Sequence, residues 1–206
     1  MKPFCSGSRD DVRLLQAVQR SEIDDDEANP FYFTEPVAPL VAARKTGKKI
    51  PLQRVVEAIM RLDRRCDYLI VEGAGGLMAP LGPNYSAADL IEKLDCGVCV
   101  VAANKLGAIN HSLLTLRLLQ KITSRPVRLL LTQLTSRSDA AMRTNRAVIS
   151  ELAAPVSVLA LPYLGRRAST LPSIQRNHTR TAGVWEELFR MSVVDCSHPS
   201  PRSRCH

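Results

Sequence analysis

Apolar stretches and amphipathic stretches alternate along most of this chain. Short apolar runs rich in β-branched and aliphatic residues are typical of buried parallel strands, and they occupy residues 68–71, 97–103, 127–131 and 156–161. Apolar positions recur at helical spacing over residues 10–19, 52–64, 86–94, 109–122 and 138–153. Strands that alternate with helices predict an α/β fold, with a mostly parallel sheet and helices on both faces.

The segments between these elements contain helix caps and polar connections. Ser86, with Asp89 three residues later, predicts a capping box, and Ser138 is the expected cap of the helix that follows it. Residues 21–39, SEIDDDEANPFYFTEPVAP, are predicted to form a long polar connection with a solvated acidic run. We expect a single domain over residues 1–191 and a disordered tail over residues 192–206, where periodicity is lost.

Composition narrows the class of protein. The 206 residues carry a net charge of +8, but the basic residues are scattered and only 4% of residues are aromatic, so no nucleic-acid partner is expected. Neither a membrane span nor a signal peptide is indicated, which predicts a cytoplasmic protein. Cys96 and Cys99 form a C-x-x-C pair inside an apolar run, and we expect ordinary buried cysteines there.

The stretch YLIVEGAGGLMAPL, from Tyr68 to Leu81, is where an apolar run breaks into an acid and three glycines. Glu72 would lie at the carboxyl end of a strand, where open α/β sheets bind ligands. Gly73, Gly75 and Gly76 would let a ligand approach the backbone closely. Taken alone, the stretch favours a glycine-rich turn that leaves a strand.

Four motifs in order resemble the dethiobiotin synthetase family: KPFCSGS from Lys2, NPFYFTEPVAP from Asn29, VEGAGG followed by Pro80-Leu81, and KLGAINHSLLT from Lys105. The resemblance extends to about Leu164. It implies a phosphate-loop NTPase-like fold and an ATP-dependent ligase of biotin biosynthesis. Such an enzyme forms a carbamate from 7,8-diaminononanoate and CO2, activates it as a mixed carbamic-phosphoric anhydride, and closes the ureido ring. The implied cofactor is Mg²⁺, and the implied assembly is a homodimer.

The resemblance also implies roles for residues near the amino end. Lys2 would be catalytic and would neutralise the carbamate and the developing phosphoryl charge, and Ser6 would hydrogen-bond the carbamate. Asp11 and Glu72 would hold magnesium, which prefers carboxylate oxygens. Asp10 and Asp11 could instead only stabilise the start of a helix.

The remaining implied contacts concern the nucleotide and the far end of the substrate. Gly73, Ala74 and Gly75 would pass along the phosphates, and the base would contact Pro162, Tyr163 and Leu164. Thr132 stands where the family has an adenine-contacting Asn. The substrate's far carboxylate would be received across a dimer interface at a helix start, by Gly107, Ala108, Ile109 and Asn110.

One family feature is missing from these residues. No GxxxxGK(S/T) phosphate loop occurs in the chain, so the amino-terminal βα unit that carries it is absent, and we interpret this as a truncated gene model. The chain as written is therefore expected to bind ATP poorly and to turn over little. The alternative function is an inactive fragment or a partner-binding remnant of such an enzyme. A more distant alternative is a related phosphate-loop ATPase, such as a cobyrinate amidation enzyme.

Overall fold

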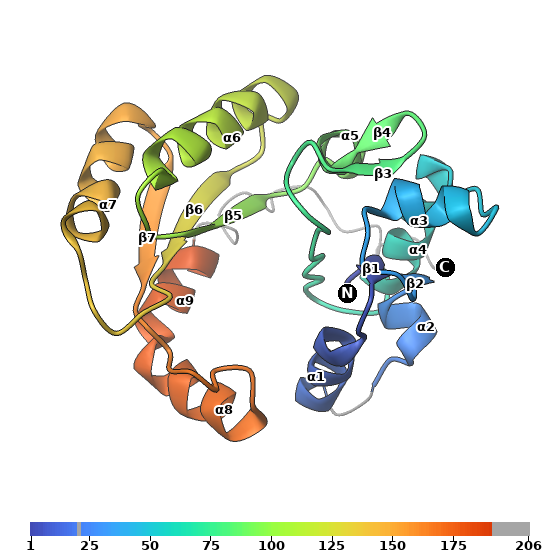
Figure 1. The fold of residues 1–206 in the computed structure, drawn as a ribbon, viewed down its shortest axis with the longest axis horizontal. Helices are drawn as coiled ribbons and strands as arrows, with labels where there is room; N and C mark the ends of the chain where they lie inside the picture. The colour runs from blue at the N-terminus through green and yellow to red at the C-terminus, as the bar shows by residue number, and fades with distance from the viewer. Residues whose placement is uncertain (20–21, 191–206) are drawn as a thin grey trace, which may run out of the picture. The chain divides into compact units, whose positions relative to one another are not determined.

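A computed structural model describes residues 1–19 and 22–190 of the chain. It forms two compact units, Met1–Asp95 and Cys96–His206, and each is considered by itself (Figure 1). The single domain predicted over residues 1–191 stays a prediction. The tail predicted over residues 192–206 lies outside the described residues.

The second unit is built on a three-stranded parallel sheet in the order β5-β6-β7. β5 is Val98–Ala103, β6 is Val127–Thr132 and β7 is Ser157–Leu161. These strands confirm three of the four predicted ones and the parallel α/β class. Each strand is joined to the next through a helix, as parallel pairing requires.

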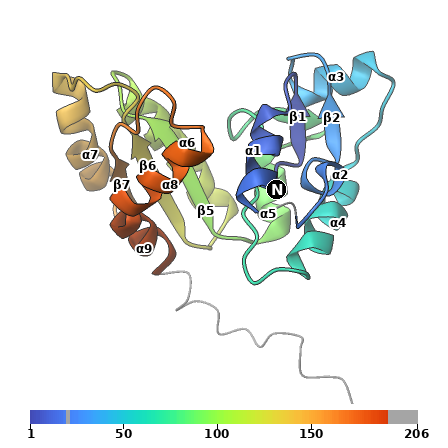
Figure 2. The ribbon, with the colours of Figure 1, turned by 90° about the horizontal axis from the view of Figure 1, so that it is seen from below.

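Helices cover both faces of this sheet, as predicted (Figures 1 and 2). α6 (Ala108–Ile122) and α7 (Ala140–Leu152) pack on one face through a cluster that includes Leu116, Leu129 and Ile149. α9 (Ala182–Arg190) packs on the other face, where Leu188 meets Leu130 and Leu159. α8 (Leu171–Arg180) precedes it, and neither α8 nor α9 was predicted.

The first unit contains two short sheets and five helices among the described residues. β1 (Phe4–Ser6) pairs in parallel with β2 (Phe31–Phe33), and β3 (Pro80–Gly82) pairs antiparallel with β4 (Tyr85–Ser86). The helices are α1 (Asp10–Val18), α2 (Asp25–Ala28), α3 (Pro39–Lys45), α4 (Leu52–Asp63) and α5 (Ala87–Leu94). One apolar core contains residues of the four strands and of α3, α4 and α5, with Phe4, Val55 and Leu81 among its least exposed members.

The prediction that residues 21–39 form a polar connection was wrong in part, because these residues contain α2, β2 and the start of α3. The acidic run forms α2, in which the Asp24 carboxylate accepts a hydrogen bond from the Glu27 backbone N–H at 2.7 Å. The aromatic cluster is β2. Elements of three or four residues are too short to show a hydrophobic period, so pattern alone missed them.

The prediction of a buried strand at residues 68–71 was also wrong, because these residues form an extended segment outside the described strands. Tyr68 is 71% exposed and Ile70 is 66% exposed. Among the described residues, the backbone partner of this segment is Met1. The Met1 nitrogen donates to the Ile70 carbonyl at 2.8 Å, and the Met1 carbonyl accepts from the Glu72 N–H at 2.9 Å. These two bonds have the parallel pattern, but they are too few to make a ladder.

The two predicted caps had different outcomes. The Ser86–Asp89 capping box is present, since the Asp89 carboxylate accepts from the Ser86 backbone N–H at 2.7 Å. Ser138 does not cap α7. Asp139 does so, because its carboxylate accepts from the Met142 N–H at 2.8 Å.

The prediction of ordinary buried cysteines was wrong for Cys99, which is exposed on β5. Val101, two residues later on the same face of the strand, is 63% exposed. β5 pairs only with β6 among the described strands, and α9 contacts β7 instead. The face of β5 that carries Cys99 and Val101 is therefore exposed, whereas α6 packs with Val100 and Ala102 on the other face.

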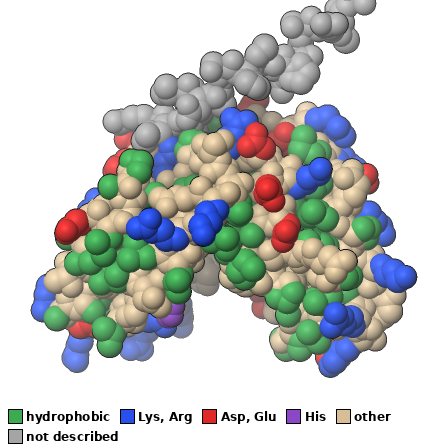
Figure 3. All heavy atoms as spheres, turned by 90° about the horizontal axis from the view of Figure 1, so that it is seen from above, with side chains coloured by type: hydrophobic (Ala, Val, Ile, Leu, Met, Phe, Trp, Pro, Cys, Tyr) green, Lys and Arg blue, Asp and Glu red, His purple; other side chains and the backbone are tan. Residues whose placement is uncertain are grey.

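The surface and helix lengths add two observations. On the face seen in Figure 3, Lys and Arg side chains are scattered among apolar ones over both units. Within residues 1–19 and 22–190, no helix is both long and apolar enough to cross a membrane.

Tyr85 offers a test of packing in the first unit. Its hydroxyl donates to the Ile50 carbonyl at 2.9 Å, and burial raises the pKa of Tyr85 to about 12. We expect Tyr85→Phe to lower the free energy of unfolding by about 1 kcal/mol at neutral pH, because the carbonyl loses its partner. Since a raised folded pKa favours the neutral phenol, the parent should lose stability from about pH 10 to pH 12.

Urea unfolding of both proteins from neutral pH to pH 12 measures this difference. Tyr85→Phe should lack the part of the stability loss at alkaline pH that ionisation of Tyr85 causes. The difference in the free energy of unfolding between the two proteins should therefore narrow with rising pH. A gap that is constant or widens would contradict the assignment.

Candidate functional site

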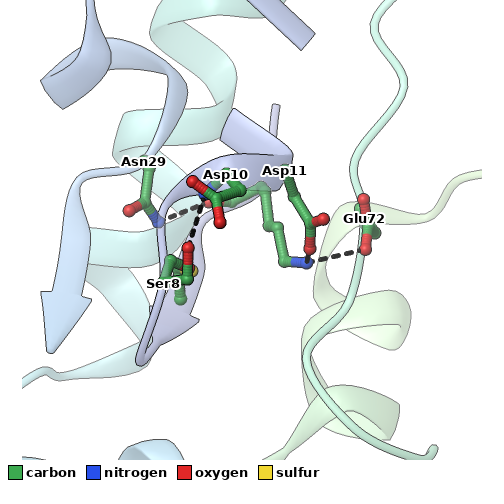
Figure 4. A network of polar contacts seen from close by, with 7 residues as sticks. Ser8, Asp10, Asp11, Asn29 and Glu72 are labelled. Carbon is green, nitrogen blue, oxygen red and sulfur yellow. Dashed lines mark hydrogen bonds and ion pairs between the residues drawn. The ribbon is translucent and has the colours of Figure 1, made fainter. Parts of the chain in front are cut away.

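The centre of the candidate site is an ammonium group held between two carboxylates (Figure 4). Lys2 Nζ lies 2.7 Å from Asp11 Oδ2 and 2.9 Å from Glu72 Oε1. The Lys2 side chain is only 13% exposed, whereas those of Asp11 and Glu72 are 66% and 51% exposed. Asp11 and Glu72, which are far apart in the sequence, therefore meet at the ammonium of Lys2.

The backbone holds these three side chains from different elements. Lys2 precedes β1, Asp11 lies in the first turn of α1, and Glu72 follows the extended segment beside Met1. Asn29 is fully buried and donates from Nδ2 to the Lys2 carbonyl at 2.8 Å. Sequence reasoning missed Asn29, whose only local signal was the proline after it.

The charge of Lys2 is reinforced by its partners. Burial of the ammonium acts to lower the pKa of Lys2, but the hydrogen bonds to Asp11 and Glu72 act more strongly together and raise it. The group is therefore cationic across the physiological range. The positive charge of the ammonium offsets the repulsion between the two carboxylates that approach it.

The same pair of carboxylates fits a hard metal ion. The Lys2 ammonium stands in for such an ion, because it already lies within contact of one oxygen from each acid. No group of three or more His, Cys, Asp or Glu side chains able to hold a metal occurs in the described part of the chain. Mg²⁺ is commonly held by one or two carboxylates with phosphate and water oxygens, so this donor set suits it.

Ser6 ends β1 and carries a buried hydroxyl. Its Oγ has no hydrogen-bond partner among residues 1–19 and 22–190, although buried polar groups are normally satisfied. The chain then turns at Gly7, whose φ is +93°. An orphan hydroxyl on the strand that begins beside Lys2 is suited to receive a polar ligand atom.

The glycine-rich stretch after Glu72 has one position that requires glycine for the turn. Gly75 has a φ of +78°, and an added Cβ would lie 2.9 Å from the Ala79 Cβ. Gly73 and Gly76 have open space around them. The exposed backbone at Gly73 can therefore be approached closely by a ligand, and Ala74 between them packs against the core.

The other candidate residues belong to the second unit. Gly107, with a φ of +89°, is the N-cap of α6, so Ala108, Ile109 and Asn110 form the first turn of that helix. The Ala108 N–H donates to the Lys105 carbonyl at 3.0 Å, whereas the N–H groups of Ile109 and Asn110 have no partner within the helix. Ala108 is buried and Asn110 is exposed. This helix start has the polarity to bind an anion.

Two polar side chains that sequence reasoning missed hold the loop before α6. Asn145 on α7 is 2% exposed and donates to Asn104 Oδ1 at 2.8 Å and to the Lys105 carbonyl at 3.0 Å. Asn104 in turn donates to the Met142 carbonyl at 3.0 Å. α7 therefore fixes the loop that leads to Gly107.

The nucleotide-base candidates follow β6 and β7. Thr132 is the last residue of β6, and its hydroxyl donates to the Ala102 carbonyl at 3.2 Å. Pro162, Tyr163 and Leu164 follow β7 directly, and the Leu164 carbonyl accepts from Asn177 at 3.0 Å. Both segments lie at the carboxyl ends of parallel strands, where ligands bind in such sheets.

The predicted site residues thus divide between the two units. Lys2, Asp11 and Glu72 come together within the first unit, and the orphan hydroxyl of Ser6 lies on the strand that follows Lys2. The candidates from Gly107 onward lie in the second unit.

Comparison with known proteins identifies relatives of this chain. A family described as "AAA domain" matches residues 1–167. ATP-dependent dethiobiotin synthetases from Bacillus licheniformis and Serratia marcescens are 35% and 37% identical over 72% and 58% of this chain. The chain spans only 65% and 56% of the length of these two relatives, less than two thirds of each. One from Anaeromyxobacter dehalogenans is 36% identical over 84% of this chain and 81% of the relative.

Proposed function

Because the chain belongs to the ATP-dependent dethiobiotin synthetase family, we propose that it closes the ureido ring of dethiobiotin. One amine of 7,8-diaminononanoate takes up CO2 to form a carbamate, and the carbamate oxygen attacks the γ-phosphorus of ATP, releasing ADP. The second amine then attacks the carbonyl carbon of the mixed anhydride, and phosphate leaves. This chemistry concentrates negative charge, so it needs fixed cations and hydrogen-bond donors.

The observation that carries the proposal is the Lys2 ammonium held between Asp11 and Glu72. A buried, cationic lysine just before β1, the strand that carries the Ser6 hydroxyl, can neutralise a carbamate while the hydroxyl hydrogen-bonds it. To do so, Lys2 must release at least one carboxylate. In this proposal the Lys2 side chain therefore moves during the reaction. It lies between Asp11 and Glu72 in the free protein and turns toward the carbamate when substrate is bound.

Asp11 and Glu72 would hold Mg²⁺ once Lys2 has turned away. When bound, the ion would supply positive charge against the phosphate oxygens. The backbone of Gly73, Ala74 and Gly75 would line the path of the phosphates. The open space around Gly73 supports this part of the proposal.

The second unit would supply the remaining contacts. The first turn of α6, from Gly107 to Asn110, would bind the far carboxylate of the substrate through the N–H groups of Ile109 and Asn110, since the Ala108 N–H donates to the Lys105 carbonyl. Thr132, Pro162, Tyr163 and Leu164 would contact the nucleotide. A homodimer in the cytoplasm completes the proposal.

Product formation from labelled bicarbonate tests this function. The purified chain is incubated with ATP, ¹³C-bicarbonate and 7,8-diaminononanoate, and dethiobiotin is measured by mass spectrometry. We expect slow, ATP-dependent formation of product that carries one ¹³C in the ureido carbon, and a further loss in Glu72→Gln. Absence of labelled product above the level of a protein-free control would contradict ring closure by this chain.

A second candidate is an inactive remnant of such an enzyme, because these 206 residues contain no GxxxxGK(S/T) pattern. A remnant would form no labelled product even when a phosphate loop is added to it. The first experiment in the Discussion therefore separates an enzyme that lacks one part from a chain that has lost the activity altogether.

A further inference from the structure

A pocket separate from the candidate functional site lies in the first unit, beside β2. It has a volume of about 370 Å³ and is formed by β2, the segment before α4 and one residue of α4. Cavities of this size hold small metabolites. None of the residues assigned above lines it.

Three cations surround this pocket. Lys48 and Lys49 come from the segment before α4, and Arg54 comes from its first turn. All three are exposed, no acidic residue lines the pocket, and none of the three makes an ion pair within residues 1–19 and 22–190. The pocket therefore has positive charge without a counter-charge.

The part of the pocket formed by β2 is aromatic, and contacts with the rest of the unit hold its side chains in place. Phe31 stacks on Phe4 with ring centroids 5.2 Å apart, and the Tyr32 hydroxyl donates to the Gly7 carbonyl at 2.9 Å. Phe33 is buried in the core. β2 is an edge strand, because it pairs only with β1 among the described strands. The wall is thus preorganised and not covered by another strand.

Charge and aromatic surface meet within the pocket. Lys48 Nζ lies 5.7 Å from the centroid of the Phe33 ring, which is within the range of a cation–π contact. A ligand with one anionic group and one flat apolar part would pair with the cations and cover the aromatic wall at the same time. Neither part alone would use both walls.

We propose that this pocket binds a small organic anion, namely a phosphate or carboxylate carried on a flat apolar body. The site is independent of the ring-closing function proposed above, because it shares no residue with it. The cations provide attraction and orientation, and the β2 wall provides apolar contact area.

Titration calorimetry of the 206-residue chain with 1-naphthyl phosphate tests the proposal. In the pocket variant, Lys48→Gln, Lys49→Gln and Arg54→Gln are combined. We expect its affinity for the probe to fall at least about tenfold, which corresponds to about 1.4 kcal/mol. In the matched control, three exposed cations that do not line the pocket are replaced, by Arg44→Gln, Arg64→Gln and Lys93→Gln. The control should retain the parent affinity.

Two further probes separate the parts of the ligand. 1-Naphthol lacks the charge and inorganic phosphate lacks the ring, so each should bind the parent at least about tenfold more weakly than 1-naphthyl phosphate. Urea unfolding checks that both variants fold. Equal losses in the pocket variant and the control, equal binding of all three probes, or no measurable binding of 1-naphthyl phosphate would each overturn the proposal.

Discussion

Extending the chain at its amino end by a strand, a GxxxxGK(S/T) loop and a helix is expected to raise dethiobiotin formation by at least about a hundredfold. The loop would supply a row of backbone N–H groups and a lysine that hold the β- and γ-phosphates of ATP. Lys2 alone cannot replace them, because it is one ammonium group that already donates to two carboxylates. The measurement is the rate of product formation from ATP, bicarbonate and the diamine by each protein.

The matched control is the same extension with the loop lysine changed to alanine. It keeps the added strand and helix, so it separates the effect of the phosphate cradle from an effect on folding. We expect the control to be folded but to lose most of the gain. Equal rates for the chain with and without the extension would show that the reasoning about the loop is mistaken.

The added strand should also stabilise the fold. Tyr68 and Ile70 are more than 60% exposed, although their position in an apolar run is typical of a sheet interior. Burial of such side chains contributes roughly 1.5 to 3 kcal/mol each when it is complete. Urea unfolding of the extended control protein measures this part of the effect.

Lys2→Met is expected to separate the two roles proposed for the site. In the extended protein the rate should fall by about a hundredfold or more, because a charge that stabilises the reacting carbamate is lost. In the 206-residue chain, however, Mn²⁺ should bind more tightly, because the ammonium no longer competes for Asp11 and Glu72. With both carboxylates more than half exposed, we expect a gain of about fivefold, which corresponds to about 1 kcal/mol.

Electron paramagnetic resonance of free and bound Mn²⁺ measures the second effect. Lys93→Met, which removes an exposed lysine from the last turn of α5, is the control and should change neither quantity. A residue with a merely structural role would not tighten metal binding when it is removed. Unchanged or weaker Mn²⁺ binding in Lys2→Met would count against the shared position of lysine and metal.

Much of the second unit could be predicted from the sequence. β5, β6 and β7 each lie in a run of apolar residues long enough to exclude a surface loop, and α6 and α7 repeat apolar positions over three or more turns. Both patterns depend on neighbouring residues, so they are readable without a tertiary structure. The capping box at Ser86 is equally local.

The first unit was less predictable because its elements are short and depend on distant partners. β1 and β2 have three residues each, and they are strands only because each pairs with the other. Residues 68–71 have the composition of a strand but only one neighbouring partner. A strand needs hydrogen bonds from outside its own segment, so local composition overestimated this one.

The sequence by itself determined the family, the parallel α/β class and the identity of Lys2, Asp11 and Glu72 as candidates, because motifs and periodicity are properties of contiguous residues. Only the tertiary structure decided that one ammonium joins both carboxylates, that Asn29 holds the Lys2 backbone, and that Cys99 is exposed. The physical reason is that ion pairs, buried hydrogen bonds and exposure arise between residues far apart in the chain. Their formation depends on which segments pack together, and no local pattern encodes that.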